Sequence, residues 1–104
     1  MGQRAGLPQR TEARRLIEDT ITICNKLGLH ARAAAKFVET SKRFGCAIEV
    51  RNEFATADGK SIMKVMLLQA TLGSDITIKA DGTDESDALS ALLDLVSNRF
   101  GEDE

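Results

Sequence analysis

Hydrophobic and polar residues alternate in three stretches of the chain, and this period of two predicts β-strands. The stretches cover residues 20–24, 47–51 and 75–80, and in each the apolar positions fall on one side. A weaker run at 54–57 follows the second stretch after a two-residue connection, which predicts the return strand of a hairpin. One apolar side per strand predicts a sheet that is covered on one face.

Three other stretches carry apolar residues at three- and four-residue spacing, which predicts helices. The first begins at Ala31 and ends before Gly45, which stands where a C-terminal glycine cap belongs. The second is shorter and covers residues 60–70. The third follows Thr83 or Asp84, either of which could cap it. Its apolar stripe consists of Leu89, Leu92, Val96 and Phe100.

The elements follow the order strand–helix–strand–strand–helix–strand–helix. A four-stranded antiparallel sheet covered on one face by three helices satisfies this order, so we predict an α+β fold. The helix between the first two strands permits a split βαβ unit, with the last strand inserted between them. We place the domain at residues 20–104, preceded by an extension at 1–19 that is disordered or forms a short helix.

Composition narrows the function classes. The 104 residues suffice for one domain, and the aromatic content of four Phe with no Trp or Tyr predicts an aliphatic core. A net charge of −2 and the missing Tyr and Trp argue against a nucleic-acid-binding sheet. No apolar run approaches the ~20 residues of a membrane span, and no secretory signal precedes the domain. These observations predict a cytoplasmic protein without a membrane partner.

The two cysteines do not indicate a metal centre. Cys24 and Cys46 stand alone, with no Cys-x-x-Cys pair. A zinc site that combined them with His30 would lack a fourth ligand and the usual pairing of close ligands. We therefore predict free thiols, no metal and no cofactor.

The only histidine, His30, stands immediately before the first predicted helix. A helix N-terminus presents unpaired N–H groups and the positive end of the helix dipole, which together favour a phosphate group. Arg32 adds a fork of donors that matches a phosphoryl group. On these residues alone two interpretations stay open. His30 either accepts a phosphoryl group as a nucleophile or only caps the helix and satisfies a local hydrogen bond.

A resemblance favours the first interpretation. The segment Gly-Leu-His-Ala-Arg-Ala-Ala-Ala at 28–35, after a Thr-Ile-Thr-Ile strand, resembles the active-site segment of the HPr family. These proteins are histidine-containing phosphocarriers of the phosphoenolpyruvate-dependent phosphotransferase system. Residues 59–66 resemble the second family signature at the family's spacing from the histidine, and residues 80–96 resemble its turn and terminal helix. The likeness runs without gaps from about residue 20 to residue 100 and implies an HPr-like open-faced β-sandwich.

The resemblance also implies residue roles. His30 would be phosphorylated on Nδ1 by enzyme I and would pass the group to enzyme IIA-type domains, while Arg32 would steady it. The protein would be a monomeric stoichiometric carrier rather than an enzyme. One position departs from the family, because Ala33 stands where the family has proline. Proline presets the backbone of a first helical turn, so we expect slower or less well-oriented transfer with alanine.

Ser61 opens the second predicted helix and is a natural N-cap. The resemblance adds a second role, because in some bacterial lineages a dedicated HPr serine kinase/phosphorylase phosphorylates the matching serine. Phosphate at Ser61 would add negative charge that repels acidic partner surfaces. Both interpretations of Ser61 stay open.

The second helix also predicts a partner surface. Val65, Leu67 and Leu68 supply enough inward residues that part of the remaining apolar set should be exposed. In the family this exposed set contacts enzyme I and the sugar-specific domains, and positive charge around it would steer acidic partners. The corresponding residues here are Ile62, Met63 and Met66, with Lys36 and Lys64 beside them; Lys26 and Lys60 could add further charge.

Two questions of function stay open from the sequence. Residues 25–32 resemble the nitrogen-related branch of the family, whereas 60–63 resemble the kinase-regulated carriers of the sugar branch. The alternative to phosphate transfer is a regulatory binding module on the same fold that acts by protein contacts. The joint presence of His30 and Arg32 argues against that alternative.

Overall fold

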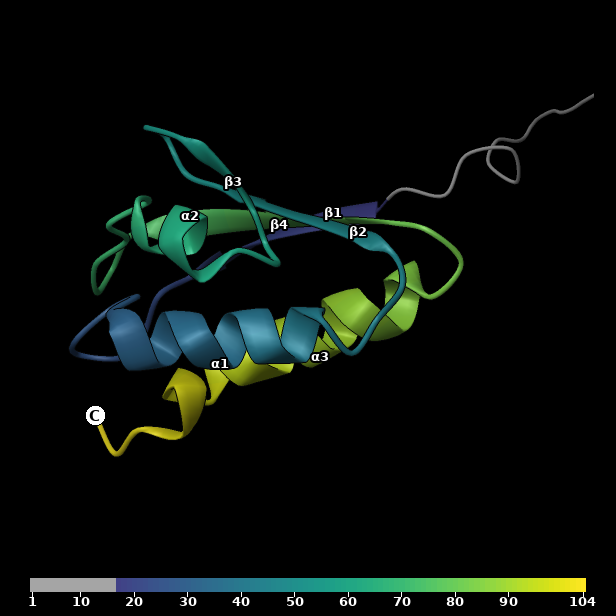
Figure 1. Cartoon of the computed structure of the whole chain (residues 1–104). Coiled ribbons are helices and arrows are strands. Elements are labelled where there is room, and N and C mark those ends of the chain that lie inside the picture. Colours follow the sequence, from purple (N-terminus) through teal and green to yellow (C-terminus); the bar gives the residue numbers. More distant parts are fainter. Residues whose placement is uncertain (1–16) are drawn as a thin grey trace, which may run out of the picture.

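The computed structural model describes residues 17–104, and its elements come in the predicted order. They are β1 (Ile17–Thr22), α1 (Ala31–Ser41), β2 (Ala47–Arg51), β3 (Thr56–Asp58), α2 (Ile62–Met66), β4 (Asp75–Asp81), α3 (Glu85–Ser97) and a 3₁₀ turn, η1 (Arg99–Gly101) (Figure 1). The prediction that the extension is disordered or helical falls, for residues 1–16, outside the described residues. Residues 17–19 belong to β1, so the first strand begins before the predicted domain boundary at residue 20.

The four strands form one sheet in the order β1–β4–β2–β3, and every neighbouring pair is antiparallel. The last strand, β4, therefore lies between the first two, which confirms the predicted split βαβ unit. Alternation decides which face is buried: Ile76 and Ile78 of β4 point into the core. The other face is polar and carries the Thr20–Thr77 hydroxyl pair at 2.8 Å.

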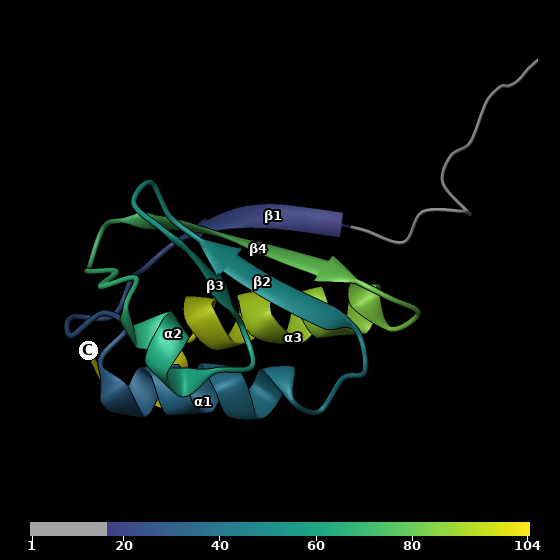
Figure 2. The same cartoon turned by 45° about the horizontal axis from the view of Figure 1, so that its top comes forward.

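All three helices lie on one face of the sheet, and α1 and α3 run along it (Figures 1 and 2). Phe37 and Val38 of α1 and Leu92 of α3 are buried against the strands. The four residues of the predicted stripe are all buried. Only Leu89, Leu92 and Val96 lie in α3, however, because the helix ends at Ser97 and Phe100 belongs to η1. The predicted α+β architecture, an open-faced sandwich with an aliphatic core, is confirmed.

The ends of the other two helices also differ from the prediction. Helix α1 ends at Ser41, and Gly45 does not cap it. Instead, the N–H groups of Gly45 and Cys46 donate to the two carboxylate oxygens of Asp84, at 2.8 and 3.0 Å. This contact spans 39 residues of sequence, so the N–H of Gly45 bonds to the start of α3 and not to the end of α1. Helix α2 stops at Met66 and not at residue 70, and the left-handed φ of 50° at Gln69 is incompatible with a longer helix.

Candidate functional site

His30 is the N-cap residue of α1, as predicted. Its carbonyl oxygen accepts the first intrahelical hydrogen bond, from the N–H of Ala34 at 2.8 Å. Its side chain makes no capping hydrogen bond, and 27% of that side chain is exposed. The imidazole is thus partly open to solvent at the start of a helix.

The imidazole contacts a carboxylate that the sequence analysis did not identify. Nε2 of His30 lies within hydrogen-bond contact of Oε2 of Glu102, which follows η1. The other carboxylate oxygen accepts a hydrogen bond from the amide of Asn25 at 2.9 Å, and the same amide donates to the carbonyl of Gly28 at 2.8 Å. Because 72 residues separate His30 from Glu102, no local pattern could have predicted the pair.

The Glu102 side chain is only 15% exposed, and its surroundings favour the charged form. Burial by itself raises the pKa of this carboxyl group. The hydrogen bonds from Asn25 and His30, with the electrostatic interactions of the carboxylate with His30 and Lys36, outweigh burial and hold the pKa below its ordinary value. Glu102 is therefore an ionised acceptor at neutral pH.

The turn at the end of α3 aims Glu102 at the histidine. Arg99, Phe100 and Gly101 all adopt left-handed φ angles, of 58°, 55° and 80°, which reverse the chain. The Phe100 ring is fully buried and anchors the turn. Its carbonyl oxygen accepts a hydrogen bond from Nζ of Lys36 at 2.8 Å, which ties the turn to α1.

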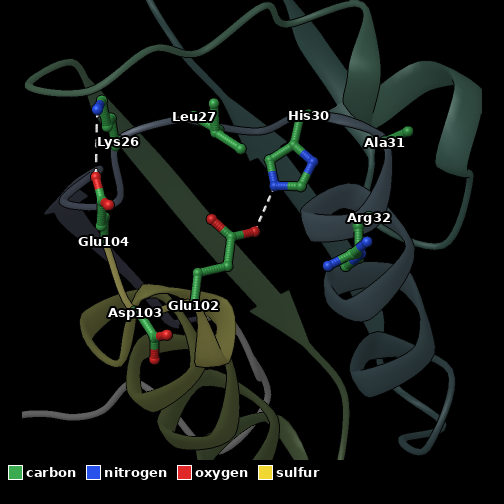
Figure 3. Close-up of a pocket in the computed structure, with 8 residues that line it drawn as sticks. All are labelled: Lys26, Leu27, His30, Ala31, Arg32, Glu102, Asp103 and Glu104. Atoms are coloured by element: carbon green, nitrogen blue, oxygen red, sulfur yellow. Dashed lines mark hydrogen bonds and ion pairs between the residues drawn. The ribbon is translucent and has the colours of Figure 1, made fainter.

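His30 and Glu102 lie in a cleft of about 670 Å³. Figure 3 shows Nε2 turned toward Glu102 and the other ring nitrogen, Nδ1, on the side of Ala31 and the beginning of α1. Arg32 lines the same cleft from the first turn of α1. The structure thus brings together the two residues that the sequence predicted as the phosphoryl site. The remaining lining residues are Lys26, Leu27, Asp103 and Glu104.

The cysteines lie apart from this cleft. Cys24 is exposed, whereas Cys46 is buried beside Asp84. Burial, with the hydrogen bond and charge of Asp84, raises the pKa of the Cys46 thiol to about 11. Within residues 17–104, no three His, Cys, Asp or Glu side chains cluster in a way that could hold a metal ion.

Ser61 is the N-cap of α2, and its hydroxyl oxygen accepts a hydrogen bond from the N–H of Lys64 at 3.3 Å. On the same helix Met63 is 79% exposed, and Ile62 and Met66 are also exposed. The prediction that Leu67 points inward is wrong, because it is 72% exposed. The helix ends at Met66, so the helical periodicity behind that prediction no longer holds at Leu67.

The exposed apolar residues of α2 adjoin the histidine site. A groove of about 370 Å³ joins Ile62 to Arg32 and Lys36 of α1. The lysines expected around this surface are partly engaged within the protein. Lys36 donates to the carbonyl of Phe100, and Nζ of Lys60 donates to the carbonyl of Phe44 at 2.7 Å. Lys26 pairs with Glu104 at 3.3 Å.

Comparison with known proteins identifies the family. Residues 17–98 match the family model described as the PTS HPr component phosphorylation site. The chain belongs to the HPr family. The HPr phosphocarrier protein of Pseudomonas aeruginosa is 53% identical over 85 residues, which are 81% of this chain and 94% of that protein. The NPr phosphocarrier protein of Escherichia coli is 35% identical over 84% of this chain and 98% of its own.

The fold agrees with solved HPr structures. HPr-C-His from Thermoanaerobacter tengcongensis superimposes with a TM-score of 0.81 and 43% identity, over 85% of this chain and 99% of that one. The HPr family consists of phosphocarrier proteins of the bacterial phosphotransferase system, so the resemblance seen in the sequence is confirmed. Across residues 17–104, no helix has both the length and the apolar character needed to cross a membrane.

Proposed function

We propose that His30 accepts a phosphoryl group from phosphorylated enzyme I and passes it to enzyme IIA-type domains. The observation that carries this proposal is the geometry of the histidine, whose Nδ1 side faces the first turn of α1 within a cleft that Arg32 also lines. The chain is a stoichiometric carrier in this scheme. The phosphoryl group passes from His30 to the next partner, and the protein returns to its unphosphorylated form.

The local chemistry suits such a step. The lone pair of Nδ1 attacks phosphorus, the bond from phosphorus to the donor atom breaks, and the donor keeps that electron pair. The N–H groups of the first turn of α1 and the guanidinium of Arg32 stabilise the negative phosphoryl oxygens. The exposed edge of the imidazole leaves room for an approaching partner surface.

Incubation with phosphoenolpyruvate and a cognate enzyme I tests the assignment. We expect an acid-labile gain of one phosphate that disappears in His30→Ala. The chain has a single histidine, so no other imidazole can replace it. Retention of the acid-labile phosphate in a folded His30→Ala protein would refute the proposal.

Arg32 needs a matched control. Arg32→Lys keeps the charge but removes the fork, so we expect slower phosphorylation. Arg43→Lys makes the same change beyond the far end of α1, where the guanidinium lies over the ring of Phe44 at 5.9 Å. Equal phosphorylation rates for the two variants would show that Arg32 does not contribute to the phosphoryl site.

We further propose that enzyme I and the IIA-type domains dock on the α2 surface, formed by Ile62, Met63, Met66 and Lys64 together with Lys36 of α1. Its groove adjoins Arg32, so a partner that covers it would bring its reactive group close to His30. Met63→Glu places a charge at the more exposed methionine of α2 and should weaken enzyme I binding in a titration followed by NMR. Leu72→Glu, at an exposed apolar residue after α2, is the control. Equal affinities for both variants would contradict this docking surface.

Ser61 is proposed as a regulatory phosphorylation site for a serine kinase/phosphorylase. Its hydroxyl also caps α2, so loss of function in Ser61→Ala could come from the helix alone. Ser61→Asn keeps a capping oxygen and cannot be phosphorylated. With the kinase and ATP we expect an acid-stable phosphate on the wild type and none on Ser61→Asn; phosphate on both would exclude Ser61.

The alternative function is a regulatory module that acts by protein contacts, on either the sugar or the nitrogen branch. The higher identity to an HPr than to an NPr favours the sugar branch. A binding module would keep its affinity for partners in His30→Ala and would not acquire phosphate from enzyme I. The proposed carrier works as a monomer in the cytoplasm, and gel filtration would detect a dimer.

A further inference from the structure

We propose that Glu102 is a positioning residue for phosphoryl transfer. Its carboxylate keeps the imidazole proton on Nε2 of His30, so that Nδ1 presents its lone pair to the cleft. The inference rests on the proposed function of His30 and adds to it the group that decides which ring nitrogen reacts.

The proton assignment follows from the chemistry of the contact. An ionised carboxylate has only hydrogen-bond acceptors, so the nitrogen that contacts it must carry the proton. Nε2 of His30 is that nitrogen. A neutral imidazole has one N–H, and Nδ1 is therefore unprotonated and nucleophilic.

Glu102 is itself held in place. Asn25, which is fully buried, donates to the carboxylate oxygen that His30 does not use, at 2.9 Å. The buried ring of Phe100 and the bond from Lys36 to its carbonyl fix the turn just before Glu102. The loop before α1 and the segment after α3 thus converge on one carboxylate, which orients the imidazole.

The same contact stabilises the product of transfer. Formation of the bond between Nδ1 and phosphorus uses the ring's lone pair and leaves positive charge on the imidazole, whose Nε2 proton stays in place. The donor takes the electron pair of the bond that breaks. The adjacent carboxylate of Glu102 favours this charge as it develops, as the aspartate beside the histidine does in serine hydrolases.

The test combines nitrogen NMR with transfer kinetics on the full chain. In ¹⁵N-labelled wild type with a neutral imidazole, Nε2 should give a protonated-type shift and Nδ1 an unprotonated-type shift. Glu102→Ala should give averaged shifts from both tautomers. Glu102→Gln keeps an oxygen that can accept from Nε2, so the wild-type tautomer should return. Asp103→Asn removes a charge one residue away and should leave the tautomer unchanged.

Single-turnover phosphorylation by enzyme I gives the second readout. Glu102→Ala should slow transfer roughly tenfold, as expected for loss of a charge-assisted hydrogen bond. Glu102→Gln should lie between wild type and Glu102→Ala, because it restores the tautomer without the charge. A merely structural role would slow both variants equally with wild-type shifts, and that result would overturn the inference.

The outcomes separate this inference from the proposed function. If His30→Ala abolishes phosphorylation while Glu102→Ala reacts at the wild-type rate, the carrier role stands and the role of Glu102 is refuted. If wild type acquires no phosphate, the carrier role and this inference, which depends on it, both fall. The tautomer shifts would then report only whether the contact exists in solution.

Discussion

Replacement of Gly28 by alanine should destabilise the protein more than any other single glycine-to-alanine change in a loop near the site. Gly28 has a φ of +67°, a left-handed conformation that glycine adopts without strain. It lies two residues before His30, where the chain passes close to the segment after α2. An added Cβ would lie 2.4 Å from the carbonyl oxygen of Ala70 and 3.0 Å from Cα of Thr71. Both neighbours are backbone atoms and cannot move aside as a flexible side chain would.

Two costs add up at this position. A non-glycine residue in the left-handed region costs about 1–2 kcal/mol. Moving the two backbone segments apart would also break the bond from the N–H of Leu29 to the carbonyl of Ala70, now 2.9 Å. Loss of that bond, with Ala70 buried, costs a further ~1–3 kcal/mol. The expected total is therefore about 2–5 kcal/mol in the free energy of unfolding.

Gly73→Ala is the matched control. Gly73 has a φ of +88°, and its added Cβ would have no atom within 4 Å, so this variant carries the conformational cost alone. Urea unfolding followed by circular dichroism suits the protein, because it has no Trp or Tyr for fluorescence. The free energies of unfolding of the two variants should differ by about 1–3 kcal/mol. Each kcal/mol corresponds to a difference of roughly 4–8 °C in Tm. Equal losses for both variants would refute the argument from close approach.

Three further predictions follow from other contacts. Asp84→Asn should lower stability at neutral pH, because the N–H of Gly45 and other backbone bonds hold the pKa of Asp84 below its ordinary value. A carboxyl group whose pKa is lowered by folding stabilises the folded protein above its unfolded-state pKa of about 3.9, and this contribution is lost in acid. In urea unfolding from pH 7 to pH 3, the free energies of unfolding of wild type and variant should therefore converge in acid. Iodoacetamide at about pH 8 should label the exposed Cys24 before Cys46, whose pKa is raised to about 11, with mass spectrometry as the readout; equal labelling would contradict the burial. Ala33→Pro should speed phosphorylation of His30, and an unchanged rate would show that the family proline is dispensable here.

The sequence predicted the fold well because its signals are local and repeated. Alternation along β4 and the helical stripe of α3 each involve several residues that agree, and the structure buries them as expected. The positions of His30 and Arg32 were also predictable, because the cap and the first turn of a helix are set by the spacing of a few residues. The errors concern where helices end, and at the end of α1 a distant residue is involved. The N–H of Gly45 donates to the carboxylate of Asp84, and Gly45 does not cap the helix that precedes it.

Glu102 shows the same limit at the site itself. Its neighbours in sequence hinted at a stop after Phe100, because Gly101 follows the last apolar residue of the stripe. That pattern does not predict the direction of the chain after Gly101. The direction comes from Lys36 of α1, which holds the Phe100 carbonyl, and from Asn25, which holds the carboxylate. Asn25 precedes His30 in the chain and Lys36 follows it. The segment that carries the histidine therefore also holds Glu102, the residue that orients the imidazole. A site built in this way can be completed only after α1 and α3 have packed together, which makes the reactive tautomer a property of the folded protein and not of the histidine segment.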